Sequence, residues 1–281
     1  MHCKLNYVKG AFFTVISMLL FSACHPDTSS NLANGDDNGG YASDASRIEW
    51  ANNDIISIAD ASGFTYNGAF MRTTYDGVCA RVATDTNSTP HTLTIRFGNT
   101  DCICLDGKKR RGTIIVTYNG LYSDSGQLHT ISFDNYFIND NQMTGTIKTS
   151  RVDTTITGNW YYNVYVNDSM NISQNPLNSQ IVGWSGTLVR KWVTGFASGT
   201  RIDDIFSISG FATLTRPNGH IFNFAIATPL QAALGCDYLR SGVVNVNGYT
   251  GSHRLDYGSG GCDAGASVYI GVNAYPVTMT P

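Results

Sequence analysis

The amino-acid sequence predicts an all-β protein: a large antiparallel meander or sandwich-like sheet with one short N-terminal helix. From residue 64 onward, apolar and polar residues alternate in short segments, as expected of half-buried antiparallel strands. Turn-forming pairs such as Asp-Gly and Asn-Gly separate these segments at intervals of roughly ten residues, which is typical of meanders and sandwiches. After residue 62 the sequence contains no long amphipathic helical pattern.

The first residues have the pattern of an export signal. Lys4 and Lys9 precede a short apolar run over residues 10–22. This run is shorter than the roughly 20 residues that a membrane-spanning helix needs, and it fits a secretory signal. An ordinary signal peptide followed by an unrelated cysteine is the alternative to the lipoprotein signal considered next.

Residues 20–24, Leu-Phe-Ser-Ala-Cys, resemble the lipobox of bacterial lipoproteins, although Phe21 departs from the usual aliphatic residue. The resemblance implies a signal peptide over residues 1–23 and lipidation of Cys24, with a diacylglycerol on the thiol and an acyl chain such as palmitate on the amine. Several buried acyl chains make a stable anchor. We therefore expect a cell-envelope protein anchored to the outer membrane, facing either the surface or the periplasm.

A polar segment separates the expected anchor from the folded part. Residues 24–45 are rich in Asp, Ser, Asn and Gly. Such a segment buries too little apolar surface to offset its ordering entropy, so we expect a flexible tether. Residues 46–281 then form the β-rich domain, either as one unit or as two related halves.

One helix is expected over residues 47–61, with Ser46 as its cap and Gly63 ending it. Its apolar residues are spaced by three and four, which predicts a single stripe packed against a sheet. The stripe consists of Ile48, Ala51, Ile55, Ile58 and Ala59.

The strongest strand signals follow in chain order at residues 113–118, 128–133, 160–166 and 221–228. Each alternates apolar with polar or small residues or is rich in β-branched residues. Turns are expected between them at Asp106-Gly107, Asn139-Asp140-Asn141, Pro217-Asn218-Gly219 and Asn247-Gly248.

Once Cys3 leaves with the signal and Cys24 carries lipid, five cysteines remain. In an oxidising envelope they should pair. Residues 91–102 and 253–262 are weakly similar and each has a cysteine upstream, which favours Cys79–Cys102 and Cys236–Cys262. The alternative first pair is Cys79–Cys104, and a redox or metal role for Cys102 and Cys104 is a weaker alternative because no second ligand pair is nearby.

Composition excludes several functions. The net charge of −3 leaves no broad basic surface for nucleic acid. Glu49 is the only glutamate, so neither an H-E-x-x-H zinc site nor an EF-hand loop is present. We expect no metal, no cofactor and no catalytic motif, since a G-x-S-x-G elbow is also absent.

Some residues still carry candidate chemistry. A hydrolase would need two carboxylates, and Asp203 with Asp204 or Asp134 with Asp140 are the candidates. A spatial Ser-His-Asp triad would have to use one of four histidines. These are His91, His129, His220 and His253.

Three further features admit a functional and a structural interpretation. Residues 108–111, Lys-Lys-Arg-Arg, either bind phosphate or an acidic glycan or form a solvated hairpin tip, and we favour the tip. Trp160, Trp184 and Trp192 either form platforms for sugars or proteins or belong to the core. Residues 153–155 and 168–170 resemble a short O-glycosylation acceptor.

Residues 97–114, 133–145 and 255–263 resemble segments of a β-rich lipoprotein family of Bacteroidota-type bacteria. The resemblance implies a lipoprotein with a β domain and carries no active site across. We predict a membrane-anchored envelope lipoprotein that is a non-catalytic binding or structural module, with a glycan or a protein as ligand. The alternative is a hydrolase acting on an envelope or glycan substrate through an Asp pair.

Overall fold

The protein is described here by a computed structural model that places residues 39–66, 79–152, 160–172, 180–195, 198 and 200–281. The expected signal peptide, Cys24, residues 25–38 of the tether and the acceptor at 153–155 lie outside the described residues.

Within the described part of the chain, one helix precedes a single sheet of thirteen strands. The helix is α1 (Gly40–Tyr66). The strands are β1 (Arg81–Asp85), β2 (His91–Ile103), β3 (Lys109–Tyr118), β4 (Leu128–Ile138), β5 (Asn141–Val152), β6 (Tyr161–Asn171), β7 (Ile181–Thr194), β8 (Ile205–Thr215), β9 (Ile221–Ala233), β10 (Leu239–Gly248), β11 (Gly251–Ser259), β12 (Gly265–Ile270) and β13 (Asn273–Thr278).

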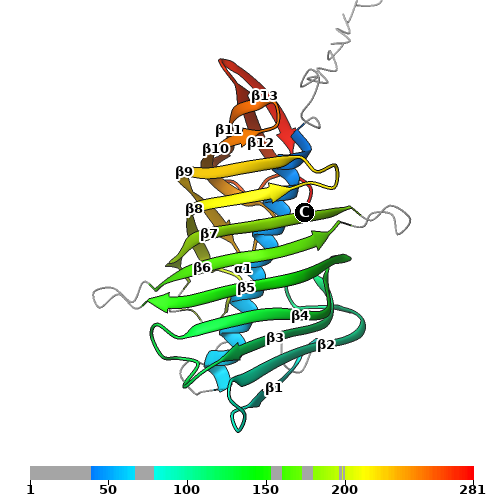
Figure 1. The fold of residues 1–281 in the computed structure, drawn as a ribbon, viewed down its shortest axis with the longest axis vertical. Helices are drawn as coiled ribbons and strands as arrows, with labels where there is room; N and C mark the ends of the chain where they lie inside the picture. Colours follow the sequence, from blue (N-terminus) through cyan, green and yellow to red (C-terminus); the bar gives the residue numbers. More distant parts are fainter. Residues whose placement is uncertain (1–38, 67–78, 153–159, 173–179, 196–197, 199) are drawn as a thin grey trace, which may run out of the picture. The chain divides into compact units, whose positions relative to one another are not determined.

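The sheet is an uninterrupted antiparallel meander in which every strand pairs with its neighbour in sequence (Figure 1). This confirms the predicted all-β class, and the four strongest strand signals fall in β3, β4, β6 and β9. Local turn chemistry explains the connectivity: for example, Gly219 has a φ of 82° in the turn that joins β8 to β9. A short turn of this kind returns the chain beside the strand it has just left, as between β8 and β9.

Bulges let this sheet curl. The register of the β3–β4 pair shifts next to Gly112, and that of the β8–β9 pair shifts next to Gly210. Both glycines have positive φ, and an added Cβ would collide with the carbonyl oxygens of Asn135 and Thr187, respectively. A bulge bends its strand and increases the local twist. The bulged strands can therefore wrap around α1.

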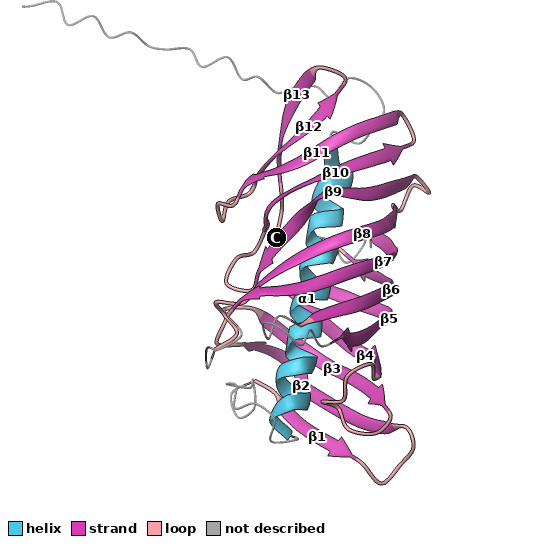
Figure 2. Cartoon of the chain, turned by 90° about the vertical axis from the view of Figure 1, so that its left-hand side faces the viewer, coloured by secondary structure: helices cyan, strands magenta, loops and turns pink. Residues whose placement is uncertain are grey.

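The helix runs along the stack of strands and is enclosed by the sheet, as the two views in Figures 1 and 2 show. It begins at Gly40, so residues 40–45 of the expected tether are helical, and it continues beyond Gly63 to Tyr66. Gly63 does not end the helix. Instead it leaves room for the ring of Tyr122, which an added Cβ would approach to 2.5 Å.

The predicted apolar stripe of the helix is confirmed, since all five of its residues are buried, but strands cover the polar side of the helix as well. Glu49, Asn53 and Asp54 are only 4%, 1% and 2% exposed.

Among the described residues, no helix combines the length and apolar character needed to cross a membrane.

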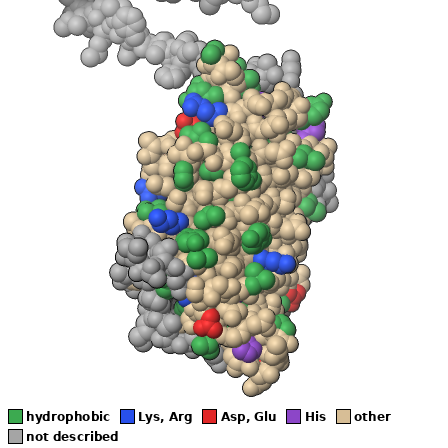
Figure 3. All heavy atoms as spheres, turned by 60° about the vertical axis from the view of Figure 1, so that its left-hand side comes forward, with side chains coloured by type: hydrophobic (Ala, Val, Ile, Leu, Met, Phe, Trp, Pro, Cys, Tyr) green, Lys and Arg blue, Asp and Glu red, His purple; other side chains and the backbone are tan. Residues whose placement is uncertain are grey.

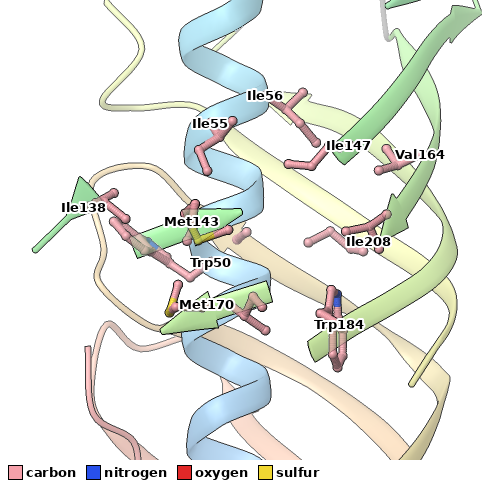
Figure 4. Packing of buried hydrophobic residues seen from close by; sticks show 14 of the residues in the cluster. Trp50, Ile55, Ile56, Ile138, Met143, Ile147, Val164, Met170, Trp184 and Ile208 are labelled. Carbon is pink, nitrogen blue, oxygen red and sulfur yellow. The ribbon is translucent and has the colours of Figure 1, made fainter. Parts of the chain in front are cut away.

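Apolar side chains form one main core between the helix and the inward face of the sheet. Figure 4 shows Trp50, Ile55 and Ile56 of α1 among inward side chains such as Ile147 of β5 and Ile208 of β8. Trp50 also donates its indole N–H to the carbonyl oxygen of Cys236 at 2.7 Å. Alternation along each strand places these apolar residues inside.

Buried polar contacts join one side of the helix to β7. The indole N–H of Trp184 donates to Glu49 Oε2 at 3.0 Å, and Arg190 Nε donates to Asn53 Oδ1 at 2.8 Å. Arg190 Nη2 also donates to the hydroxyl of Ser57 at 2.5 Å. The helix partners are four residues apart and therefore share one face. These contacts fix the rotation of the helix about its own axis and its position along that axis relative to β7.

An ion-pair cluster lies on another side of the helix. Asp54 accepts from Arg110 at 2.6 Å and from Arg201 at 2.9 Å. Burial alone would raise the pKa of Asp54, but the two guanidinium groups outweigh it and lower that pKa. Arg110 is fully buried and also pairs with Asp106 at 2.7 Å. The carboxylate of Asp54 is thus held ionised in the core.

The described residues contain two disulfides, Cys79–Cys102 and Cys236–Cys262, with Cα–Cα distances of 5.6 and 5.7 Å. Cys104, the alternative partner of Cys79, is a buried free thiol. Cys102 is therefore not available for a redox or metal pair with it. The two weakly similar segments belong to one continuous sheet.

Candidate functional site

The outward face of the sheet carries side chains aligned in rows, because cross-strand partners in adjacent strands point to the same side. We call one of these the ring row, after its two exposed rings. From β5 to β11 it contains Lys148, Tyr165, Thr187, Phe211, Ala225, Asn245 and Arg254. Phe211 is 69% exposed and Tyr165 is 49% exposed.

A second row runs beside the ring row, two residues away along each strand. We call it the hydroxyl–amide row, because every member is Ser, Thr or Asn. From β5 to β11 it contains Thr146, Asn167, Ser185, Thr213, Asn223, Asn247 and Ser252. Within it, the hydroxyl of Thr213 donates to Asn223 Oδ1 at 3.0 Å. The row offers uncharged donors and acceptors over several strands.

The two rows line an open groove of about 710 Å³ over β7 to β11. Among the residues that the structure describes, its lining contains no charged side chain, and Phe211 is its one large exposed apolar side chain. Its lining extends from Ser185 and Thr187 of β7 to Ser252 of β11. An exposed ring among uncharged hydrogen-bonding groups suits a neutral, hydroxyl-rich ligand.

Charge is sparse over much of the surface. On the face drawn in Figure 3, charged side chains are few, and hydrophobic ones are scattered among uncharged polar groups and backbone. The low overall content of charged residues, 14%, agrees with this view.

The tryptophans expected as platforms belong largely to the core. Trp184 and Trp192 are 5% and 6% exposed, and their indole N–H groups donate to Glu49 and to the carbonyl of Thr194. Trp160 is half-buried against Trp192, with ring centroids 6.0 Å apart. The core interpretation of these residues is the one that the structure supports.

The exposed ring of Phe211 was not found by sequence reasoning. A signal was present in the alternation of β8, where Phe206, Ile208, Ala212 and Leu214 are all buried. Even-numbered residues of this strand point inward, so Phe211 must point outward.

Neither candidate Asp pair lines the groove. Asp204 is buried, whereas its neighbour Asp203 is exposed and accepts from the hydroxyl of Ser198 at 2.8 Å. Asp140 pairs with Arg111 at 3.0 Å, and Asp134 is exposed on β4. The hydrolase alternative therefore gains no support from the described site.

The four histidines have separate surroundings. His129 is buried and stacks on Tyr122 at 4.0 Å; burial, followed by the charge of Arg151, lowers its pKa to about 4. His253 is buried beside the hydroxyl of Tyr41 at 3.2 Å. His91 packs on Tyr118, and His220 stacks on Tyr249. The contacts described for these histidines assemble no Ser-His-Asp triad.

The predicted solvated tip at residues 108–111 is wrong for two of its members. Arg110 is fully buried, and Lys108 is 8% exposed and forms an ion pair with Asp237. Arg111 pairs with Asp101 at 2.5 Å. These cations are held by acidic partners within the protein, which also weighs against a phosphate site.

The acceptor-like residues 168–170 lie on β6 with two of three side chains inside, since Asp168 and Met170 are buried. The hydroxyl of Ser169 contacts that of Thr144 at 2.8 Å. Across the described residues, no group of three or more His, Cys, Asp or Glu side chains is placed to hold a metal ion.

Comparison of the chain with protein-family models, with curated proteins and with solved structures finds no match in any of the three. The groove and its two rows are therefore the basis for assigning a function.

Proposed function

We propose that this chain is a lipid-anchored protein of the bacterial cell envelope whose outward sheet face binds a neutral glycan without cleaving it. The observation that carries the proposal is the groove, in which Phe211 is exposed among uncharged hydroxyl and amide groups. A sugar presents an apolar ring face that packs on an aromatic ring, while its hydroxyls bond to Ser, Thr and Asn. The absence of carboxylates from the lining favours binding over hydrolysis.

The proposed anchor rests on the sequence of residues 20–24 and on the resemblance to Bacteroidota-type lipoproteins. The two disulfides are consistent with an oxidising compartment such as the envelope. We propose Cys24 as the lipidated residue and the outer membrane as the location.

Glycan binding is tested with the full-length protein, purified in detergent and titrated with soluble neutral polysaccharides. Phe211→Ala should weaken binding about tenfold, the loss expected when a central aromatic contact is removed. Leu105→Ala is the matched control, since Leu105 is 71% exposed but lies outside the groove. Equal binding by wild type and Phe211→Ala would refute the assignment of the groove.

Anchoring is tested in cells. Labelled palmitate should be incorporated into the wild-type protein, whereas Cys24→Ser should remain unlabelled and leave the membrane fraction. Protease treatment of intact cells, with lysed cells as control, then distinguishes a surface-facing domain from a periplasmic one.

A further inference from the structure

The two exposed rings of the ring row are separated by one strand. Tyr165 lies on β6 and Phe211 on β8, and both pair with Thr187 of the intervening β7. Neighbouring strands lie about 4.8 Å apart, so these two positions are about 9.5 Å apart across the sheet. The threonine between them is smaller than either ring. A ligand could therefore contact both rings while passing over Thr187.

The ring row is uncharged between two cations. Lys148 on β5 and Arg254 on β11 flank it, and Arg254 lies over the ring of Tyr269 at 3.9 Å. From β6 to β10 the row contains only uncharged side chains, over about 19 Å of strand spacing. This uncharged stretch runs perpendicular to the strands.

The hydroxyl–amide row follows the same stretch at a constant offset. Its members are two residues away from those of the ring row, alternately after and before them because the strands are antiparallel, or about 7 Å away. Over β6 to β8 these are Asn167, Ser185 and Thr213, beside Tyr165, Thr187 and Phe211, respectively. Over β6 to β8, two rings thus lie on one side and three hydrogen-bonding side chains on the other.

On the premise that the groove binds a neutral glycan, as proposed above, we infer that its ligand is an extended, linear polysaccharide that lies across the strands. One sugar ring packs on Phe211 and a second packs on Tyr165, with one sugar between them over Thr187. The hydroxyl–amide row bonds to hydroxyls along the edge of the same chain. Tyr165 lies one strand beyond the residues that line the groove, so it extends the site towards β6.

The experiment measures affinity against chain length. The full-length protein is titrated with neutral β-linked oligosaccharides of glucose, and of N-acetylglucosamine, from disaccharide to hexasaccharide. For wild type, affinity should rise with length until the oligosaccharide reaches both rings, and then level off. Tyr165→Ala should bind the disaccharide as wild type does but should lose the gain with length, becoming about tenfold weaker for the hexasaccharide.

Three controls separate the causes. Tyr165→Phe keeps the ring and should keep the gain with length. Leu105→Ala should match wild type at every length, because Leu105 is exposed elsewhere. Phe211→Ala should be weak at every length. Tyr165 is 49% exposed and Phe211 is 69% exposed, so the thermal unfolding of the variants should match that of the wild type. A match excludes misfolding as the cause of any lost affinity.

The outcomes distinguish the inference from the function on which it rests. If Phe211→Ala abolishes binding but Tyr165→Ala retains the full gain with length, the ligand does not cross the strands; the inference fails and glycan binding stands. If no neutral glycan binds to wild type, both fail. Binding only to anionic polysaccharides, with a steep loss in salt, would show that Lys148 and Arg254 dominate and would overturn the neutral ligand.

Discussion

Glu49 should make the stability of this protein depend on pH. Its carboxyl is buried between α1 and β7, where it accepts from Trp184 and from the amide of Asn53 at 3.0 Å each. Burial raises its pKa from 4.5 to about 7, against the opposing effect of these hydrogen bonds. The folded state therefore holds this proton more tightly than the unfolded chain does.

The sign and size follow from that difference in pKa. The stability contributed by protonated Glu49 is fully present below pH 4.5 and is lost as pH rises through about 7. At about 1.4 kcal/mol per pH unit, this interval corresponds to about 3 kcal/mol of unfolding free energy. Burial, followed by the charge of Glu49, also raises the pKa of Asp168. Repulsion between the two carboxylates therefore adds to the loss of stability of the wild type at high pH, and a Glu49 variant without the charge lacks this loss.

The assay compares wild type with Glu49→Gln, which keeps an acceptor for Trp184 but cannot ionise. Urea unfolding is measured from below pH 4.5 to above pH 7, and the wild-type free energy minus that of the variant is plotted against pH. This difference should fall by about 3 kcal/mol across the range. His129, whose pKa is lowered to about 4, has the opposite pH dependence, but it is present in both proteins and cancels.

A second variant tests the cause of the shift. Trp184→Phe removes a hydrogen bond that lowers the pKa of Glu49. In this variant the fall of unfolding free energy with pH should therefore extend to higher pH than in the wild type. A difference between wild type and Glu49→Gln that stays flat over the whole range would refute the reasoning, because it would mean that Glu49 ionises alike in the folded and unfolded states.

Three further predictions concern the frame that carries the outward face. Arg110→Met should cost about 3 kcal/mol, since it removes one cation from a buried carboxylate, whereas Arg111→Ala should cost less than about 1 kcal/mol because its pairs are partly exposed. Replacing Cys236 and Cys262 together by Ser should cost about 3.5 kcal/mol, the chain-entropy value for their sequence separation of 26. Gly210→Ala should cost about 2 kcal/mol, because its φ is 121° and an added Cβ meets a carbonyl of the neighbouring strand. Urea midpoints with a constant m-value measure all three.

Each of these has a contradicting result. Equal losses for Arg110→Met and Arg111→Ala would show that the buried pair has no special weight. A double-serine variant as stable as wild type would mean that the disulfide does not form. A neutral Gly210→Ala would show that β8 does not need its bulge.

Local sequence determined the strands, the turns and the fold class. The alternation at residues 160–166 became β6, with Tyr162, Val164 and Val166 buried as that pattern requires. Alternation and turn residues act over a few neighbours, so they can be recognised without knowing the rest of the chain. Where the connection is short, as over residues 216–220 between β8 and β9, the same local signal also places two successive strands side by side.

Only the tertiary structure decided the role of the helix and the place of the site. Glu49, Asn53 and Asp54 resemble solvated helix residues in sequence, yet they are buried because strands more than fifty residues away, as at Arg110, return to cover them. Phe211 and Tyr165 likewise become neighbours on one row only through the pairing of β6, β7 and β8. Burial and cross-strand register depend on contacts between residues far apart in the sequence. A local sequence pattern does not identify which distant residues make these contacts.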